Sequence, residues 1–226
     1  MVIENIIKET KKNKFSAGLY DLFEDLIDEG FDTVLDVGCG KGPWSYIGAK
    51  KRKFKNIYAC DVFDDFQTEE IGKLAESVTY RQVENDLLPF AENSFDLVFS
   101  MDVIEHVADD LNFISEKIRV AKPGGKIIIG TPNYYRIGNL PLIFSGRLKY
   151  PRILGRDSYG DVLYLREYKK ADLIKLLEQF NDKIDRKSVK ITPCYLGVPM
   201  LEMGVRKVPL ILESFCQYWL VELIKN

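Results

Sequence analysis

The chain has few residues of the kinds that bind metals or form cross-links. Among its 226 residues there is one histidine, His106, and there are four cysteines, none of which belongs to a C-x-x-C pair. Scattered cysteines of this kind argue against a disulfide framework and against a zinc site. We therefore expect no metal site, and reduced thiols in a cytoplasmic protein.

The chain also lacks an excess of positive charge. Its formal net charge is −2, which excludes the overall positive field that is typical of nucleic-acid-binding domains. A short basic run, KKRKFK at 50–55, closes a predicted helix. We interpret it as the solvated last turn of that helix, where cations interact favourably with the helix dipole, and we expect no nucleic-acid partner.

Long apolar runs are scarce as well. Residues 1–14 carry charge throughout and lack the apolar centre of a signal peptide. The apolar stretch at 209–226 contains Glu213 and Glu222, and it is shorter than the roughly 20 apolar residues of a membrane-spanning helix. We expect an apolar C-terminal helix over 205–226 that packs on the domain or forms a homodimer interface, with contact at a membrane surface as the alternative.

The overall composition is that of a folded protein. Hydrophobic residues make up 46% of the chain and charged residues 29%, a balance that argues against extensive disorder. We expect residues 1–226 to form one domain.

The stretch FDTVLDVGCGKG at 31–42 organises the rest of the chain. The apolar run TVL is followed by Asp36 and then by glycines at alternate positions, Gly38, Gly40 and Gly42. Such a run predicts a buried strand that enters a loop, and the residues after the loop predict a helix. Strand, glycine-rich loop and helix together form the first half of a nucleotide-binding βαβ unit.

Three ligand classes compete for this loop. A phosphate-binding P-loop would need G-x-x-x-x-G-K-[ST], but Lys41 is followed by Gly42. A dinucleotide fingerprint would need G-x-G-x-x-G, but the third glycine comes one residue early and Pro43 follows it. The carboxylate of Asp36 would repel a pyrophosphate, whereas it suits a ligand with an ammonium group, such as S-adenosylmethionine.

At these residues the chain resembles the class I S-adenosylmethionine-dependent methyltransferases, whose first motif is D-x-G-x-G-x-G. The string from Asp86 through LLPF to Phe95 and Asp96 resembles the branch that includes ubiquinone- and menaquinone-pathway methyltransferases. The resemblance covers about residues 30–180. It implies S-adenosylmethionine as the cofactor and a Rossmann-like class I methyltransferase fold.

Five strand–helix repeats with short connections predict a doubly wound, mostly parallel α/β sheet with helices on both faces. The predicted strands cover residues 32–37, 56–60, 78–83, 95–100 and 126–130. The family's sheet has seven strands. We expect the sixth at 188–192, and the stretch 194–204 is a candidate for the seventh.

Acidic residues at the ends of predicted strands are candidates for cofactor binding. Asp61 closes the second strand, where a carboxylate can accept hydrogen bonds from both hydroxyls of a ribose. The resemblance implies that Asp86 meets the adenine amino group, that the backbone of Leu87 reaches a ring nitrogen, and that the carbonyl of Met101 faces the methionine amino group. The expected cofactor-binding residues are Asp36, Gly38, Cys39, Gly40, Asp61, Val62, Asp86, Leu87 and Met101.

His106 is the candidate catalytic residue. Methyl transfer from a sulfonium needs alignment, and it needs a base only if the acceptor must lose a proton. The alternative is that His106 packs under the cofactor loop. Asp102, Glu105 and His106 also form D-x-x-E-H, and some relatives bind a divalent metal with E-x-x-E-H. The first acid is one methylene shorter here, and we favour the structural interpretation over the metal site.

Residues 133–168 interrupt the strand–helix repeat. A long excursion at the carboxyl edge of a sheet predicts a functional lid, and we interpret this one as a substrate-binding insertion. Tyr134, Tyr135 and Arg136 begin it, and we expect them to line the acceptor pocket. The alternative is that they only pack within the lid. The apolar residues of the insertion weakly favour a hydrophobic acceptor.

Together these features predict an enzyme that transfers a methyl group from S-adenosylmethionine to a small molecule, with an oxygen acceptor slightly favoured. DNA adenine methylation is set aside because S-M-D-V stands at 100–103 in place of an N-P-P-Y-like motif. One alternative is a protein on the same fold that binds the cofactor or a partner without turnover. A nicotinamide dehydrogenase is disfavoured by the glycine spacing and by Asp36.

Overall fold

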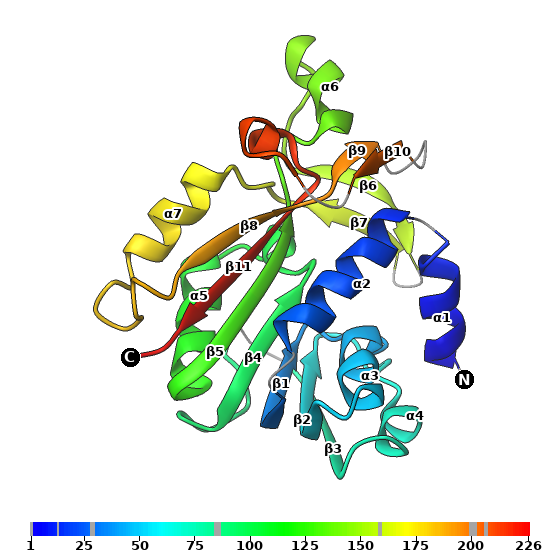
Figure 1. Cartoon of the computed structure of the whole chain (residues 1–226), viewed down its shortest axis with the longest axis vertical. Helices are drawn as coiled ribbons and strands as arrows, with labels where there is room; N and C mark the ends of the chain where they lie inside the picture. Colours follow the sequence, from blue (N-terminus) through cyan, green and yellow to red (C-terminus); the bar gives the residue numbers. More distant parts are fainter. Residues whose placement is uncertain are drawn as a thin grey trace.

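The computed structural model describes residues 2–12, 14–27, 30–83, 87–157, 160–198, 203–205 and 208–226. Its main strands are β1 (Phe31–Val37), β2 (Phe54–Asp61), β3 (Ser77–Gln82), β4 (Phe95–Met101), β5 (Ala121–Pro132), β8 (Lys190–Cys194) and β11 (Tyr218–Ile224). They form one seven-stranded sheet in the order β3-β2-β1-β4-β5-β11-β8 (Figure 1). The α/β fold with a mostly parallel seven-stranded sheet is confirmed.

The first five strands run parallel to one another. β1 lies between β2 and β4, with Leu35 opposite both Tyr58 and Val98. β2 pairs with β3, and β4 pairs with β5, in the same direction. All five carboxyl ends therefore meet at one edge of the sheet, which is where ligands bind in open α/β sheets.

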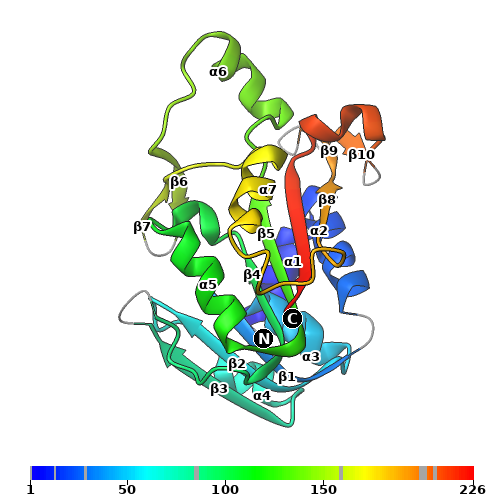
Figure 2. The same ribbon diagram turned by 90° about the vertical axis from the view of Figure 1, so that its left-hand side faces the viewer.

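Helices cover both faces of the sheet. They are α1 (Val2–Thr10), α2 (Lys14–Leu26), α3 (Pro43–Lys50), α4 (Thr68–Gly72), α5 (Asp110–Val120) and α7 (Lys170–Glu178). Side chains alternate along a strand, so Val34 belongs to the core that contains Phe23 of α2. Leu35 belongs to the opposite core with Ile118 of α5 and Leu177 of α7 (Figure 2).

The C-terminal segment differs from the expected apolar helix over 205–226. Its last part is β11, which runs antiparallel between β5 and β8, with Leu220 opposite Gly130 and Thr192. Trp219 and Leu220 point to opposite faces, and both are buried. A strand that is covered on both faces needs apolar residues on both sides, which explains why β11 is apolar except at Glu222, whose carboxylate pairs with Lys126 at 3.1 Å. The expected helix is therefore wrong for this segment. Before β11, the described residues Leu210–Phe215 form the 3₁₀ segment η4.

The seventh strand of the sheet is β11 and not the stretch 194–204. That stretch contributes β9 (Leu196–Val198), which pairs antiparallel with β10 (Met203–Val205) in a separate two-stranded sheet. Residues 199–202 lie outside the described residues. None of the helices in the described ranges combines the length and the apolar character needed to cross a bilayer.

The segment 133–168 projects beyond the carboxyl edge of the sheet. It contains η2 (Ile137–Asn139), α6 (Leu140–Phe144) and the antiparallel pair β6 (Arg152–Asp157) and β7 (Gly160–Tyr164). In both ribbon views α6 forms the tip at the upper end of the molecule. The segment is thus an insertion between β5 and α7 with its own elements.

Candidate functional site

The glycine loop joins the carboxyl end of β1 to α3. The backbone nitrogens of Gly38 and Cys39 donate to the carbonyl oxygen of Cys60 at 2.8 and 3.2 Å, which fastens the loop to the end of β2. Gly38 has φ +74°, and a Cβ there would lie 2.4 Å from a methyl carbon of Val103. Only glycine fits that position, because both the backbone angle and the space exclude a side chain.

Gly40 and Asp61 form the centre of the site. The backbone nitrogen of Gly40 donates to Oδ2 of Asp61 at 2.7 Å, and the nitrogen of Phe63 donates to Oδ1 at 3.2 Å. A Cβ on Gly40 would meet no atom within 4 Å, so the loop presents bare backbone to open space. A carboxylate accepts about four hydrogen bonds, and Asp61 therefore keeps acceptor capacity for a ligand.

Asp36 lies behind the loop. It is 1% exposed, and its Oδ2 accepts a hydrogen bond from Oγ of Ser45 on α3 at 2.6 Å. Burial raises the pKa of Asp36 to about 7, although the Ser45 hydroxyl partly offsets that effect. This hydrogen bond connects the first turn of α3 to the end of β1.

A cavity of about 310 Å³ lies beside the glycine loop. Its size falls at the lower end of the roughly 300–1,000 Å³ that is typical of small-molecule sites. It brings together four of the predicted residues, Gly38, Asp61, Val62 and His106. Its remaining walls are mostly apolar and come from Val37, Cys60, Val83, Leu88, Val103, Val107, Asp109, Asn112 and Phe113.

The other predicted cofactor residues that the structure describes do not line this cavity. Cys39 and Met101 are buried, Gly40 belongs to the same loop as Gly38, and Leu87 is exposed. Asp86 lies outside the described residues. The sequence interpretation missed Asn112 and Phe113, although Asp109 caps α5 through the backbone nitrogen of Asn112. A D-x-x-N spacing before an apolar helix could have indicated that this first turn meets the cavity.

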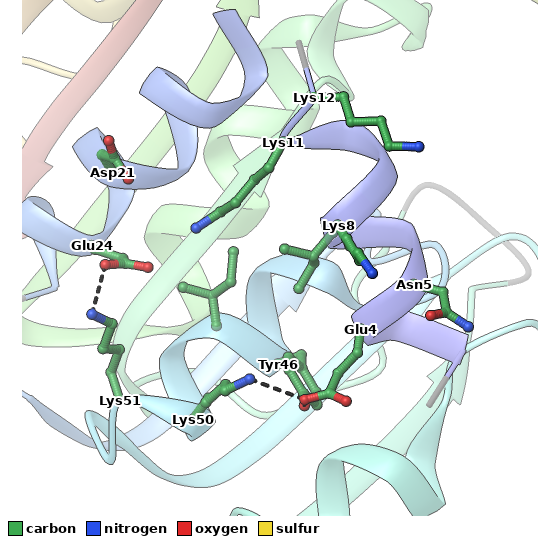
Figure 3. Close-up of a pocket in the computed structure, with 12 residues that line it drawn as sticks. Glu4, Asn5, Lys8, Lys11, Lys12, Asp21, Glu24, Tyr46, Lys50 and Lys51 are labelled. Carbon is green, nitrogen blue, oxygen red and sulfur yellow. Dashed lines mark hydrogen bonds and ion pairs between the residues drawn. The ribbon is translucent and has the colours of Figure 1, made fainter. Parts of the chain in front are cut away.

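A larger groove of about 1,120 Å³ lies elsewhere, between α1, α2 and α3 (Figure 3). Its lysines face acidic side chains, since Lys50 pairs with Glu4 at 3.0 Å and Lys51 pairs with Glu24 at 2.9 Å. These two lysines begin the basic run at 50–55, so part of its charge is neutralised within the fold. Because the groove is lined by none of the predicted site residues, the smaller cavity is the candidate functional site.

His106 lies in the 3₁₀ segment η1 (Ile104–His106), directly after β4. Its Nδ1 lies 2.6 Å from the carbonyl oxygen of Leu163 in β7. A carbonyl can only accept, so Nδ1 carries the hydrogen and the neutral ring keeps its lone pair on Nε2. The ring of Tyr164 packs edge-on at 4.6 Å between centroids. The insertion thus determines the tautomer of the histidine.

Two acidic residues precede His106. Glu105 is buried, its Oε2 accepts from Oγ1 of Thr131 at 3.0 Å, and its Oε1 lies 3.9 Å from Nε2 of His106. Burial and the charge of Asp102 raise the pKa of Glu105 well above its usual range. Asp102 has a left-handed backbone with φ +58°. The Asp102 residue is exposed, but the protein atoms around its carboxyl group partly desolvate it. This desolvation raises the pKa of Asp102 to about 6.

These acids do not complete a metal centre. Within the part of the chain that the structure describes, no group of three histidine, cysteine, aspartate or glutamate side chains is arranged to hold a metal ion. Among the described residues, the side chains of the D-x-x-E-H motif are therefore not arranged as metal ligands.

Arg136 is engaged inside the insertion. It pairs with the buried carboxylate of Glu167, which also accepts from Tyr150 Oη at 2.6 Å and from Arg152 at 3.0 Å. Asn139 donates to the same carboxylate. One carboxylate therefore ties together four donors along the insertion.

Tyr134 and Tyr135 are half-buried at the start of the insertion. Their rings pack edge-on at 5.1 Å between centroids, and Nζ of Lys169 lies 4.9 Å from the centroid of the first and 5.4 Å from that of the second. Neither ring lines the 310 Å³ cavity.

Part of this chain is similar to known methyltransferases. Residues 35–129 match the family described as a methyltransferase domain. A probable S-adenosylmethionine-dependent methyltransferase of Mycolicibacterium smegmatis is 31% identical over 184 residues, which are 81% of this chain and 63% of that protein. The tocopherol O-methyltransferase of Arabidopsis thaliana is 36% identical over 43% of this chain and 29% of its own length.

A ubiquinone biosynthesis O-methyltransferase of Cereibacter sphaeroides is 33% identical over 50% of this chain and 46% of that protein. This chain thus spans less than two thirds of the length of each of these relatives.

Solved structures share the fold. An N-methyltransferase from Bradyrhizobium japonicum, in complex with S-adenosyl-L-homocysteine, has a TM-score of 0.61 at 15% identity and covers 95% of this chain and 89% of its own. A 1,6-didemethyltoxoflavin N1-methyltransferase from Burkholderia thailandensis has a TM-score of 0.59 at 15% identity, over 92% of this chain and 76% of its own.

Proposed function

We propose that this chain is a class I S-adenosylmethionine-dependent methyltransferase, which transfers a methyl group from S-adenosylmethionine to a small molecule. Residues 35–129 match a methyltransferase domain. The observation that carries the proposal is the hydrogen bond of Gly40 to Asp61 at the mouth of a cavity of about 310 Å³. A hydroxyl oxygen is the favoured acceptor, because relatives that are 36% and 33% identical to this chain over the aligned residues are named as O-methyltransferases.

The residues around the cavity fit the cofactor. Asp61 retains acceptor capacity for the two hydroxyls of a ribose, and its half-buried position protects those bonds from water. The open space beside the backbone of Gly40 lets a ligand approach closely. Apolar walls at Val62 and Phe113 suit the faces of an adenine.

We also propose contacts to S-adenosylmethionine for the other predicted cofactor residues. Cys39 contributes backbone in the loop, Met101 offers its carbonyl to an amino group, and Leu87 offers its backbone to adenine. Asp86 keeps the role that the family resemblance implies. Asp36 acts indirectly, because its carboxyl is bonded to Ser45 and shapes the loop from behind.

When bound, S-adenosylmethionine supplies an electrophilic methyl group on a sulfonium. The chain supplies alignment, exclusion of water and a place for the proton of the acceptor. We propose that Nε2 of His106 takes that proton, since the bond of Nδ1 to Leu163 leaves the lone pair on Nε2. Glu105, with Oε1 at 3.9 Å, stabilises the protonated ring whenever it is itself ionised.

The insertion at 133–168 is proposed to cover the acceptor. Tyr134 and Tyr135 give it aromatic surface at the carboxyl edge of the sheet. We withdraw Arg136 as a direct acceptor contact, because its guanidinium pairs with Glu167 and holds the insertion together. Because β11 is buried in the sheet, the C-terminal segment does not offer the helical face that we expected for a dimer or a membrane. We keep the cytoplasm as the proposed compartment on the pattern of cysteines.

The test is transfer of labelled methyl groups. The chain is incubated with S-adenosylmethionine that carries a labelled methyl group and with hydroxylated aromatic acceptors that bear or lack an apolar tail. We expect label in a hydroxylated acceptor, and more of it when the tail is present. Label in amines alone would overturn the oxygen preference. Cofactor binding without labelling of any acceptor would favour the alternative of a binding protein.

A further inference from the structure

Large apolar side chains are exposed at the end of the molecule where the strands have their carboxyl ends. Phe144 of α6 is 86% exposed, and Leu210 and Ile211 of η4 are 83% and 88% exposed. Among the described residues, no other large apolar side chain is more than 63% exposed. In both ribbon views α6 and η4 lie at the same, upper end of the molecule (Figures 1 and 2). We call these two elements the apical surface.

Hydrogen bonds connect the start of the insertion to the segment that contains η4. Asn133, at the root of the insertion, donates from Nδ2 to the carbonyl oxygens of Ser214 and Cys216, both at 2.8 Å. The acid within η4, Glu213, pairs with Lys170 at 3.0 Å. The two apolar tips are therefore connected through bonds at their base, and the acid beside one of them is neutralised.

Positive charge dominates the first part of the insertion, before Asp157. Residues 133–156 contain no aspartate or glutamate, whereas arginine or lysine stands at 136, 147, 149, 152 and 156. Arg136 and Arg152 are bonded to Glu167, but Arg147 and Lys149 are exposed directly after α6. In a chain whose overall charge is −2, this is a local concentration of cations next to exposed apolar groups.

We propose that the apical surface docks on a lipid bilayer that contains anionic lipids. Apolar side chains at isolated tips can enter the interfacial region, while neighbouring cations are attracted to anionic headgroups. A protein–protein interface usually has a continuous apolar core. Here the exposed apolar side chains lie on two separate tips. The inference deepens the proposed function, because docking at this end would bring the site close to an acceptor dissolved in the bilayer.

The test is co-sedimentation of the purified chain with vesicles, which requires no turnover. One set of vesicles is phosphatidylcholine alone, and the other contains phosphatidylglycerol as well. The variants are Phe144→Ser combined with Ile211→Ser for the apolar tips, and Arg147→Glu combined with Lys149→Glu for the cations. The control is Leu74→Ser, an exposed leucine after α4, at the opposite end of the sheet.

We expect binding to the anionic vesicles that weakens with added salt, and a loss of about tenfold in affinity for each double variant. The Leu74→Ser control should bind as the wild type does, and all variants should retain their affinity for S-adenosylmethionine in calorimetry, which shows that they are folded. Absence of the wild type from the anionic vesicle pellet, or equal binding by the tip variants, would overturn the proposal. A concentration-dependent dimer that the tip variants abolish would overturn it in favour of a second copy of the chain. If docking fails while methyl transfer to a soluble acceptor persists, only the docking proposal is lost.

Discussion

The backbone nitrogen of Gly40 donates a hydrogen bond of 2.7 Å to Oδ2 of Asp61, so the glycine loop after β1 and the tip of β2 hold each other in place. This hydrogen bond occupies one acceptor site of the Asp61 carboxylate and fixes the direction of its remaining acceptor sites. Glycine suits position 40 because the backbone there has φ +48°, a left-handed conformation, with open space beside it. Asp61 thereby has two roles: it holds the glycine loop in its conformation, and it offers the remaining acceptor sites to a ligand.

Alanine at two neighbouring glycines should separate folding from binding. In Gly38→Ala the new methyl group would lie 2.4 Å from Val103, and we expect a loss of about 1–3 kcal/mol in the free energy of unfolding. In Gly40→Ala there is space, so the fold should lose only about 1 kcal/mol from the left-handed backbone, while affinity for S-adenosylmethionine falls. Urea denaturation and calorimetry measure the two effects. The reverse order of stabilities would contradict this description of the loop.

Replacing Asp36 should change how stability depends on pH. Burial raises the pKa of its carboxyl from the ordinary 3.8 to about 7, so between these values the unfolded chain releases a proton that the folded chain keeps. This carboxyl therefore makes the free energy of unfolding fall as pH rises across that window, by at most about 4 kcal/mol, and adds no further slope above it.

Asp36→Asn removes that contribution. Relative to the wild type, we expect the variant to become progressively more stable between about pH 4 and pH 7, in urea denaturation at a series of pH values. The control is Asp64→Asn, which changes an exposed aspartate in the loop after β2. Parallel stability curves for Asp36→Asn and the wild type would show that Asp36 is not buried as described.

Asparagine at position 106 should keep the position of the side chain but remove its basicity. The amide can still donate to the carbonyl oxygen of Leu163, as Nδ1 does now, but it has no basic nitrogen. We expect kcat for a hydroxylated acceptor to fall by about 10²–10³-fold, with cofactor affinity retained. An unchanged kcat would assign His106 to packing alone.

The insertion should depend on one buried carboxylate. Glu167 accepts from side chains at 136, 139, 150 and 152. Glu167→Gln leaves two guanidinium groups without their counter-charge, and breaking a buried pair of this type costs about 3–5 kcal/mol. We expect faster hydrogen exchange and faster proteolysis within 136–157, with less change in β1 and β4. Glu178→Gln, at an exposed position of α7, is the matched control, and equal behaviour of the two variants would argue against the anchoring role.

The parallel half of the fold could be predicted because its signals are local. Short apolar runs that end in glycine or aspartate indicated β1, β2 and β4 within a few residues of their observed bounds. The C-terminal strand could not be recognised in this way. β11 lies between two strands and under helices on both faces, so apolar side chains point to both faces and the strand shows no apolar–polar alternation.

The same limit applies to the site. The spacing of Gly38, Gly40 and Asp61 indicated a ligand loop because these residues are close in sequence or end strands. Which carboxylate faces the ligand depends on partners that no local pattern reveals. Asp36 is bonded to Ser45, nine residues later, and Arg136 pairs with Glu167, thirty-one residues later. Only the folded chain brings those partners together.

Calorimetric titration with S-adenosylmethionine, its demethylated product S-adenosylhomocysteine and NAD tests the central claim most directly. It is carried out on the wild type, on Asp61→Ala and on the control Asp64→Ala. We predict that the first two ligands bind to the wild type and to the control, that both bind at least about tenfold more weakly to Asp61→Ala, and that NAD does not bind. Binding of NAD alone, or equal affinity of Asp61→Ala and the wild type, would contradict the assignment of this loop and carboxylate as the cofactor site.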